Sequence, residues 1–366
     1  MIETTVVYLR KDNKILLGKK LRGFGMGKIT APGGKFESGE TPAECVTREC
    51  FEETGVRLTK FEEVAHVVYD DLYYQGKPER ELMHVFIATE WEGTPMDSDE
   101  LDLEWYALRD IPYDKMWSDA QVFLPDLLRG KKLEAYFRYN EKNEFAKHWV
   151  KPINTDIIIT LSNEDFDFPV NNNFDKAKLK FGARAVVLDK DRRVCVTHAT
   201  NKGYYKLPGG GQEPGELAFE NVEREIHEEV GYKVKDLVSL GRTIELRGGE
   251  KPDDTPKIVD NQIFVCQVEK FIGTMQEEDE IEDGTQTEWF ESIDEAIETI
   301  QKNMSLEDLT AISSDLGYRA HFWRDREIAI LRAAKQYLDR PAAFSEREEK
   351  PVAPEDYGEE DFEDDL

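Results

Sequence analysis

Short apolar runs separated by polar turns fill the first 140 residues and predict a sheet-rich fold. Residues 3–9 and 14–18 flank the polar stretch RKDN, which predicts two strands joined by a turn. A helix is expected from about Thr41 to Thr54, because Pro42 is tolerated in a first helical turn and Gly55 is a typical C-terminal stop. A second helix is expected after Asp119. Further strands are expected at residues 64–74, 81–91, 103–108 and 131–140.

The second half of the chain repeats this order of elements. Strands at residues 181–189 and 193–199 open it, and a helix is expected at residues 294–302. Residues 305–340 have apolar side chains at mixed i+3 and i+4 spacing, which predicts an amphipathic helical segment. We expect that segment to pack between domains or at a homodimer contact. Further strands are expected at residues 156–161, 237–246, 261–269 and 287–292, and a loop at residues 276–284.

These elements predict two domains. The chain has 366 residues and 39% hydrophobic content, which is enough for two separate cores. The last 22 residues are rich in acidic side chains and are expected to be disordered. The predicted division is a first domain at residues 1–153, a connector at 154–177, a second domain at 178–303, a helical extension at 304–342 and an acidic tail at 343–366.

A repeated motif organises both domains. Residues 33–56 read GGKFESGETPAECVTRECFEETGV, and residues 209–232 read GGGQEPGELAFENVEREIHEEVGY. Both contain Gly, then Glu six residues later, then Arg-Glu-x-x-Glu-Glu-x-Gly, and every matched residue recurs 176 positions later, as Gly210 does after Gly34. Chance does not produce seven matches at fixed spacing in a chain of this length.

The glutamates of the motif predict a metal site. Glu49, Glu52 and Glu53 have i, i+3, i+4 spacing, so a helix places their carboxylates on one face. Clustered carboxylates repel, and a hard divalent cation with oxygen ligands relieves that repulsion. The alternative is an ordinary solvated Glu-rich helix, which explains neither the glycines nor the repeat. The corresponding residues of the second copy are Glu225, Glu228 and Glu229.

The motif resembles the Nudix box, G-x5-E-x7-R-E-U-x-E-E-x-G-U, in which U is apolar. The resemblance covers both domains and implies an α/β fold: two Nudix α/β/α sandwiches with mixed sheets. It implies hydrolysis, with Mg²⁺ or alternatively Mn²⁺, of a nucleoside diphosphate linked to another group. It also implies that the carbonyls of Gly33 and Gly209 are metal ligands. Glu49 and Glu225 are then candidate catalytic bases, with Arg48 and Arg224 holding them in place, and a water held between metal ions is the alternative base.

The first domain resembles the MutT-type diphosphatases that act on oxidised purine nucleoside triphosphates. The matching stretches include LLGKKLRGFGMGK, PGGKFESGET and IPYDKMWSDA. The resemblance assigns Thr5, Phe24, Trp117 and Asp119 to the base pocket and Lys20 to the phosphate or ribose end. Without it, Phe24 and Trp117 would be read as core aromatics.

The sequence departs from that branch at two base-reading positions. Thr30 stands where the branch has Asn, and Ala120 where it has a second Asp. Both changes remove hydrogen-bonding groups, so selectivity for oxidised purines is expected to be weaker. Glu100 lies in an acidic loop where this family often has a further metal ligand or base, and a solvated loop is an equal alternative.

The amino-acid composition limits the classes of partner that the protein is expected to bind. Lys and Arg total 48 against 77 Asp and Glu, a net charge of −29, which disfavours long nucleic acid as a partner and leaves small nucleotides. The four cysteines lack CxxC spacing and are expected to be buried small hydrophobic residues. No apolar run is long enough to span a membrane and the N-terminus has no signal-peptide pattern, so a cytoplasmic protein is expected. The histidines are expected to be packing residues without a catalytic role.

The leading functional hypothesis is a nucleotide pyrophosphohydrolase with two sites. The first would convert a purine nucleoside triphosphate, oxidised or normal, to monophosphate and pyrophosphate, and the second would act on an unidentified nucleoside diphosphate derivative. Dinucleoside polyphosphates, ADP-ribose-like compounds and capped RNA are rival substrates, although the acidic composition weighs against RNA. In a second hypothesis, the second domain only binds a nucleotide and regulates the first.

Overall fold

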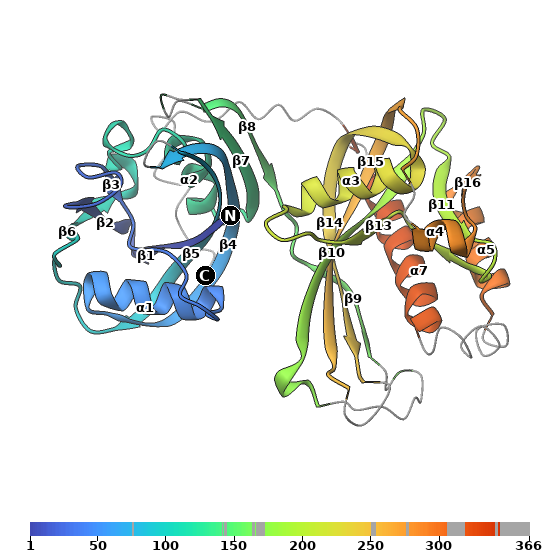
Figure 1. Cartoon of the computed structure of the whole chain (residues 1–366), viewed down its shortest axis with the longest axis horizontal. Coiled ribbons are helices and arrows are strands. Elements are labelled where there is room, and N and C mark those ends of the chain that lie inside the picture. Colours follow the sequence, from blue (N-terminus) through green and yellow to red (C-terminus); the bar gives the residue numbers. More distant parts are fainter. Residues whose placement is uncertain are drawn as a thin grey trace. The chain divides into compact units, whose positions relative to one another are not determined.

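The computed structural model divides the chain into two compact units, one containing Met1–Pro152 and the other Ile153–Glu346. Each unit is built around one large mixed sheet (Figure 1). The structure describes residues 1–74, 77–140, 142, 145–162, 165, 173–249, 254–275, 278–305, 319–340 and 343–344.

The first unit has the strand order β3-β2-β1-β5-β4-β7-β8, with β6 paired to β2. The β1–β5 and β4–β7 pairs are parallel, whereas the β1–β2, β4–β5 and β7–β8 pairs are antiparallel. Its elements are β1 (Ile2–Lys11), β2 (Lys14–Lys20), β3 (Ile29–Thr30), α1 (Pro42–Thr54), β4 (Arg57–Tyr74), β5 (Lys77–Glu92), β6 (Leu101–Ala107), α2 (Ala120–Leu128), β7 (Leu133–Tyr139) and β8 (Phe145–Pro152), with 3-10 turns at Leu108–Asp110 and Tyr113–Lys115.

Helices cover both faces of this sheet (Figure 1). On one face, Val46 and Cys50 of α1 pack with Val7 and Phe86. On the opposite face, α2 contributes Phe123 to a larger core with apolar residues of β1, β4 and β5. Successive strand residues point to opposite faces, which is why alternate residues of β1 belong to different cores.

The second unit repeats the plan with the order β12-β11-β10-β15-β14-β9, where β13 pairs β10 and β16 pairs β11. Phe219 of α3 packs against Phe264 of β15 with ring centroids 4.7 Å apart, as α1 packs in the first unit. Its elements are β9 (Ile157–Ser162), β10 (Lys178–Leu188), β11 (Val194–Ala199), β12 (Tyr204–Lys206), β13 (Gly209–Gly211), α3 (Ala218–Val230), β14 (Tyr232–Arg247), β15 (Lys257–Phe271), α4 (Glu278–Asp283), β16 (Thr285–Phe290), α5 (Ile293–Asn303) and α7 (Arg319–Leu338), with a 3-10 turn at Phe174–Lys176.

The predicted α/β/α sandwiches with mixed sheets are therefore confirmed. The division at residues 153, 177 and 303 stays a prediction; within the predicted connector, β9 pairs with β14 of the second unit. The loop predicted at 276–284 is wrong, because Glu278–Asp283 forms the short helix α4. Strand β8 was not predicted. Of the acidic tail predicted at 343–366, residues 345–366 lie outside the described residues.

The helical segment predicted at 305–340 contains α7, while residues 306–318 lie outside the described residues. Its buried residues Ile328, Leu331 and Ala334 belong to the core of the second unit, together with Val186 and Val265 of the sheet. This packing buries apolar side chains of α7 within the second unit; the inter-domain or homodimer contact stays a prediction. No helix in the described ranges is long and apolar enough to cross a membrane. All four cysteines are buried and free, as predicted.

Candidate active site

In the first unit the motif forms a loop followed by α1. Thr41 caps the helix: its hydroxyl accepts a hydrogen bond from the Glu44 amide, and the Glu44 carboxylate accepts one from the Thr41 amide at 2.9 Å. Gly55 ends the helix in the left-handed conformation that glycine adopts without strain. The helix register is thus fixed at both ends, which sets the direction of its glutamates.

Two glycines allow the loop to lie against the sheet and the helix. A Cβ on Gly33 would lie 2.1 Å from the Thr5 carbonyl oxygen, and a Cβ on Gly34 would lie 2.4 Å from the carboxyl carbon of Glu49. The Gly33 amide donates a hydrogen bond to Glu53 at 2.8 Å. Only residues without a side chain permit these approaches, so the glycines bring the loop backbone to the motif carboxylates.

Arg48 connects three other residues of the motif. Its guanidinium donates to Glu40 at 2.7 and 2.9 Å, to Glu49 at 2.7 Å and to the Lys35 carbonyl at 3.0 Å. A planar fork of donors suits such bidentate and branched contacts. Arg48 therefore holds Glu49 against the loop, which is a positioning role.

The carboxylates of the first motif differ in exposure. Burial raises the pKa of Glu53 to about 7, against the hydrogen bond from Gly33, and burial also raises the pKa of Glu49. Glu52 is more open, with 58% of its side chain exposed. Carboxylates supply the oxygen ligands that a hard divalent cation prefers, and the charge of such a cation would favour their ionised forms.

The second motif has the same geometry. The Gly209 amide donates to Glu229 at 2.9 Å, and a Cβ on Gly210 would lie 2.5 Å from a Glu225 carboxylate oxygen. Burial raises the pKa of Glu225. Arg224 donates to Glu216 at 2.9 Å and to the Gly211 carbonyl at 3.0 Å, and it lies 2.9 Å from both Glu225 and Glu228.

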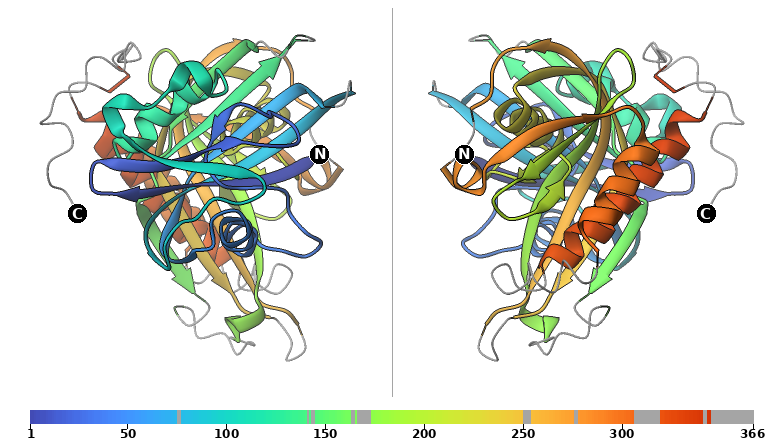
Figure 2. Two further views of the ribbon diagram at one scale, coloured as in Figure 1. Left: turned by 90° about the vertical axis from the view of Figure 1, so that its left-hand side faces the viewer. Right: turned by 90° about the vertical axis from the view of Figure 1, so that its right-hand side faces the viewer.

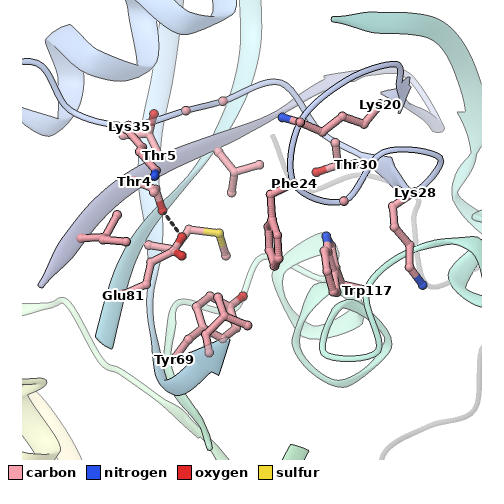
Figure 3. A pocket seen from close by; sticks show the side chains of 18 of the residues that line it. Thr4, Thr5, Lys20, Phe24, Lys28, Thr30, Lys35, Tyr69, Glu81 and Trp117 are labelled. Atoms are coloured by element: carbon pink, nitrogen blue, oxygen red, sulfur yellow. Dashed lines mark hydrogen bonds between the residues drawn. The ribbon is translucent and has the colours of Figure 1, made fainter. Parts of the chain in front are cut away.

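A cavity of about 480 Å³ opens beside the first motif (Figure 3). Glu49 and Glu52 do not line it, but Glu49 lies directly beneath Gly34, which does. The cavity lining includes every residue assigned to substrate binding and three of those assigned to the metal: Thr5, Lys20, Phe24, Thr30, Trp117, Asp119, Gly33, Glu53 and Glu100.

The aromatic residues of the cavity stack on each other. The rings of Phe24 and Trp117 have centroids 5.1 Å apart and an interplanar angle of 21° (Figure 3). The Lys28 ammonium lies 5.6 Å from the centre of the Trp117 ring and donates to the Met116 carbonyl at 3.0 Å. A flat apolar wall with a cation beside it is suited to a nucleobase.

Asp119 is a buried residue of the cavity lining. It accepts a hydrogen bond of 2.6 Å from the Tyr69 hydroxyl, and its second oxygen, Oδ1, has no partner among the described residues. Burial raises the pKa of the Asp119 carboxyl, while the bond from Tyr69 opposes the rise. A buried carboxyl oxygen without a partner beside a cavity is available to a polar ligand.

Sequence reasoning missed several cavity residues. Tyr69, Met83 and Glu81 come from the strands β4 and β5, and Lys28 comes from the glycine-rich stretch before β3. Strand alternation could have placed Tyr69 and Met83 on one face, but not next to Asp119. Glu100, a candidate metal ligand, forms an ion pair with Arg22 at the cavity edge, with Nη2 and Oε1 2.5 Å apart.

A separate cluster contradicts the view that the histidines are isolated packing residues. His66 and His84 are paired on β4 and β5, and one oxygen of Glu63 lies 3.1 Å from His66 Nε2 and 2.6 Å from His84 Nδ1. Among the described residues, this is the trio whose candidate ligand atoms all lie within 4.8 Å of one another; neither motif's glutamates form such a trio. The assignment of the glutamates of each motif to a metal site stays a prediction.

Comparisons with known proteins agree with the repeated motif. The family model described as "NUDIX domain" matches residues 2–127 and 178–309. The oxidized purine nucleoside triphosphate hydrolase of Mus musculus is 31% identical over 151 residues, covering 41% of this chain and 95% of that protein. The Danio rerio protein of the same description is 32% identical over 144 residues, covering 39% and 90%. Among solved structures, a MutT protein from Bacillus halodurans is 29% identical and covers 41% of this chain and 97% of its own, with a TM-score of 0.37.

Proposed function

Because this chain belongs to the NUDIX domain family and is a hydrolase, we propose that it is a nucleotide pyrophosphohydrolase with two metal-dependent sites. The observation that carries the proposal is the cavity of the first unit, which joins Glu53 of the motif to Trp117 and Asp119. The same cavity thus combines an acidic metal-ligand residue with an aromatic wall and a hydrogen-bonding carboxyl. A nucleotide has the matching ends.

The first site acts on purine nucleoside triphosphates. The rings of Phe24 and Trp117 contact the base, and the free oxygen of Asp119 accepts a hydrogen bond from its edge. Lys20 and Arg22 line the cavity with Glu53 and Glu100, so they are placed to contact phosphates. The Mus musculus and Danio rerio relatives are described as acting on oxidized purine nucleoside triphosphates, which supports this substrate class.

Thr30 and Ala120 set the expected selectivity. Thr30 lines the cavity, where its hydroxyl donates to the Ala31 carbonyl at 3.3 Å, and Ala120 is a buried part of the core that has no polar side-chain group. Fewer groups are therefore available to distinguish an oxidised from a normal purine. We expect oxidised and normal purine triphosphates to be hydrolysed at similar rates.

Mg²⁺, with Mn²⁺ as the alternative, is the proposed cofactor of both sites. In the first site the Gly33 carbonyl and the carboxylates of Glu49, Glu52, Glu53 and Glu100 would hold it; in the second, the Gly209 carbonyl with Glu225, Glu228 and Glu229. When bound, such an ion neutralises phosphate charge and lowers the pKa of bound water.

The chain's own residues position and deprotonate the nucleophile. Glu49, oriented by Arg48, accepts a proton from the attacking water. The water oxygen forms a new bond to phosphorus as the bridging P–O bond breaks, which gives nucleoside monophosphate and pyrophosphate. Glu225, beside Arg224, has the same role in the second site. The substrate of that site is an unidentified small molecule, a nucleoside diphosphate derivative.

Turnover of a nucleotide panel with Mg²⁺ tests this proposal. Glu53→Gln is expected to abolish hydrolysis of purine triphosphates, and Glu229→Gln to abolish a different activity. Each variant serves as the control for the other. If Glu229→Gln retained every activity while the second unit still bound nucleotide, the result would instead favour the regulatory hypothesis for that domain. Unchanged triphosphate hydrolysis in Glu53→Gln would contradict the assignment of the first site.

A further inference from the structure

Helix α7 lies outside the part of the chain that the family model matches. The match ends at residue 309 and α7 begins at Arg319. Figure 2 shows α7 running along the strands of the second sheet, and its side chains share a core with Val186 and Val265. In the first unit the equivalent face of the sheet carries both α2 and the cavity, because Val6 and Val85 of that face belong to the core with Phe123 of α2.

The two repeats allow a residue-by-residue comparison of that face. Gly33 lies so close to the backbone of Val6, and Gly209 to that of Arg184, that a Cβ on either glycine would clash. Arg184 therefore occupies the position that the cavity residue Val6 has in the first unit. In the first unit Glu81 pairs with Ile2 on one side and with Tyr69 on the other. In the second unit Val259 pairs in the same way with Lys180 and Glu245. Since Lys180 corresponds to Ile2, Glu245 corresponds to Tyr69. The apolar floor of the first cavity is therefore replaced by charged residues.

Of these charged residues, Glu245 attaches α7 to the sheet. The Arg326 guanidinium donates to Glu245 at 2.6 Å and to Glu327, and Arg247 lies 2.5 Å from Glu245. The side chains of Arg326 and Glu245 are 1% and 0% exposed. This cluster of charged side chains is too enclosed for a base to reach. It anchors α7 to the sheet as the Asp119–Tyr69 contact anchors α2, but it does not line an open cavity.

Trp323, one turn before Arg326, remains accessible. Its ring lies 4.5 Å from the Tyr204 ring, and the Lys206 ammonium lies 5.8 Å from the centre of the Trp323 ring. Both Trp323 and Lys206 are partly exposed. Lys206 is three residues before Gly209, as Thr30 is before Gly33, so it takes the place of a cavity residue of the first unit. The first unit has the same pairing of a lysine with a tryptophan, Lys28 over Trp117.

We propose that Trp323 and Lys206 bind the part of the second site's ligand that lies beyond the diphosphate. Trp323 supplies a flat surface for a nucleobase, and Lys206 donates to an acceptor oxygen, either a base carbonyl or a phosphate. The C-terminal helix is thus a wall of the second site. Asp119 of the first site accepts a hydrogen bond from the ligand, whereas Lys206 of the second site donates one. This inference rests on the proposed function only in that the second unit binds a nucleotide.

Calorimetric titration of the full chain tests it. The parent carries Trp117→Ala and Glu53→Gln, which weaken the first site, and the probes are AMP, GMP, UMP and ribose 5-phosphate, each with Mg²⁺. Trp323→Leu keeps apolar packing but removes the flat ring, and it is expected to weaken the three nucleotides about tenfold while leaving ribose 5-phosphate unchanged. Trp323→Phe restores a ring and is expected to bind as the parent does.

Lys206→Met keeps the aliphatic stem between the two rings and removes only the charge. If Lys206→Met weakens the binding of GMP and UMP more than that of AMP, Lys206 contacts a base carbonyl. If it weakens the binding of all four probes equally, Lys206 contacts a phosphate. Melting temperatures verify that each variant is folded. Unchanged affinities in folded Trp323→Leu and Lys206→Met, or a parent that binds none of the nucleotides, would overturn the inference. Binding of the three nucleotides, together with unchanged activity of Glu229→Gln toward every member of the nucleotide panel, would support it while contradicting hydrolysis at the second site.

Discussion

The backbone amide of Gly33 donates a hydrogen bond of 2.8 Å to the carboxylate of Glu53. Gly209 and Glu229 form the same bond at 2.9 Å in the second unit. The bond ties the start of each motif to the last turn of its helix. It also orients a buried carboxylate that, we propose, binds a divalent cation.

The glycine that follows in each motif should be essential for metal binding. Gly210→Ala would place a Cβ 2.5 Å from a Glu225 oxygen, so the carboxylate must move. Changing a group that orients a metal ligand typically costs about 10- to 100-fold in metal affinity. Titration with Mn²⁺, followed by electron paramagnetic resonance, is expected to detect two motif sites in the parent chain and one in Gly210→Ala.

Gly211→Ala is the matched control, because a Cβ at Gly211 meets nothing within 4 Å. It is expected to retain both sites. If Gly210→Ala and Gly211→Ala bound the same amount of Mn²⁺, Glu225 would not be a ligand in the way that the motif suggests.

Asp119 should determine the base preference of the first site. Asp119→Asn keeps the shape but replaces an acceptor with a donor at the oxygen that has no partner. We expect kcat/KM for purine triphosphates to fall about 10- to 100-fold, with a smaller fall for pyrimidine triphosphates. Tyr69→Phe removes only the bond that positions Asp119 and should have a weaker effect in the same direction. Equal losses for purines and pyrimidines would show that Asp119 does not contact the base.

Local patterns explain most of what the sequence predicted. The capped helix α1, the hairpin at the N-terminus and the two glycine turns depend on neighbouring residues, so spacing alone identifies them. Strand β8 was missed because Lys147 and Lys151 alternate with its apolar residues, a pattern that protects edge strands but resembles a polar loop.

Tertiary pairing explains what the sequence could not predict. Glu63, His66 and His84 meet because β4 and β5 are paired in one register, with a bulge between Glu63 and Ala65. In the same way, the alignment of Arg326 with Glu245 joins residues 81 positions apart. Spacing along the chain contains no information about either contact. Residues of that kind become visible only when the strand order is known.

The buried charges beneath α7 should make Arg326 essential for the stability of the second unit. Removing one member of a buried ion pair leaves the other charge uncompensated and costs about 3–5 kcal/mol. Arg326→Ala is therefore expected to lower the free energy of unfolding of the second unit by that amount in urea titrations. Arg324→Ala, which removes a more exposed pair with Asp325, should cost less than about 1 kcal/mol. Equal losses in the two variants would contradict an anchoring role for Arg326.

The Glu63 cluster should give the first unit a defined pH dependence. Burial acts to raise the pKa of Glu63, but hydrogen bonds and charges from His66 and His84 outweigh it and hold the pKa at about 2. Burial acts to lower the pKa of His66, and Glu63 more than compensates, so the pKa of His66 is raised. Glu63 therefore contributes stability above about pH 4.5, its unfolded value, and loses it as pH falls toward 2. His66 contributes stability below about pH 6.5 and loses it as pH rises through its raised pKa.

The two windows overlap between about pH 4.5 and 6.5, where the cluster should stabilise the fold most. Urea unfolding of the parent chain and Glu63→Gln across pH 4 to 9 is expected to give the largest difference in that interval and a smaller one toward pH 9. Glu62→Gln is the control, because its carboxylate is exposed and pairs with Lys132. A difference between parent and Glu63→Gln that stayed constant with pH, or matched that of Glu62→Gln, would show that Glu63 does not raise the pKa of His66.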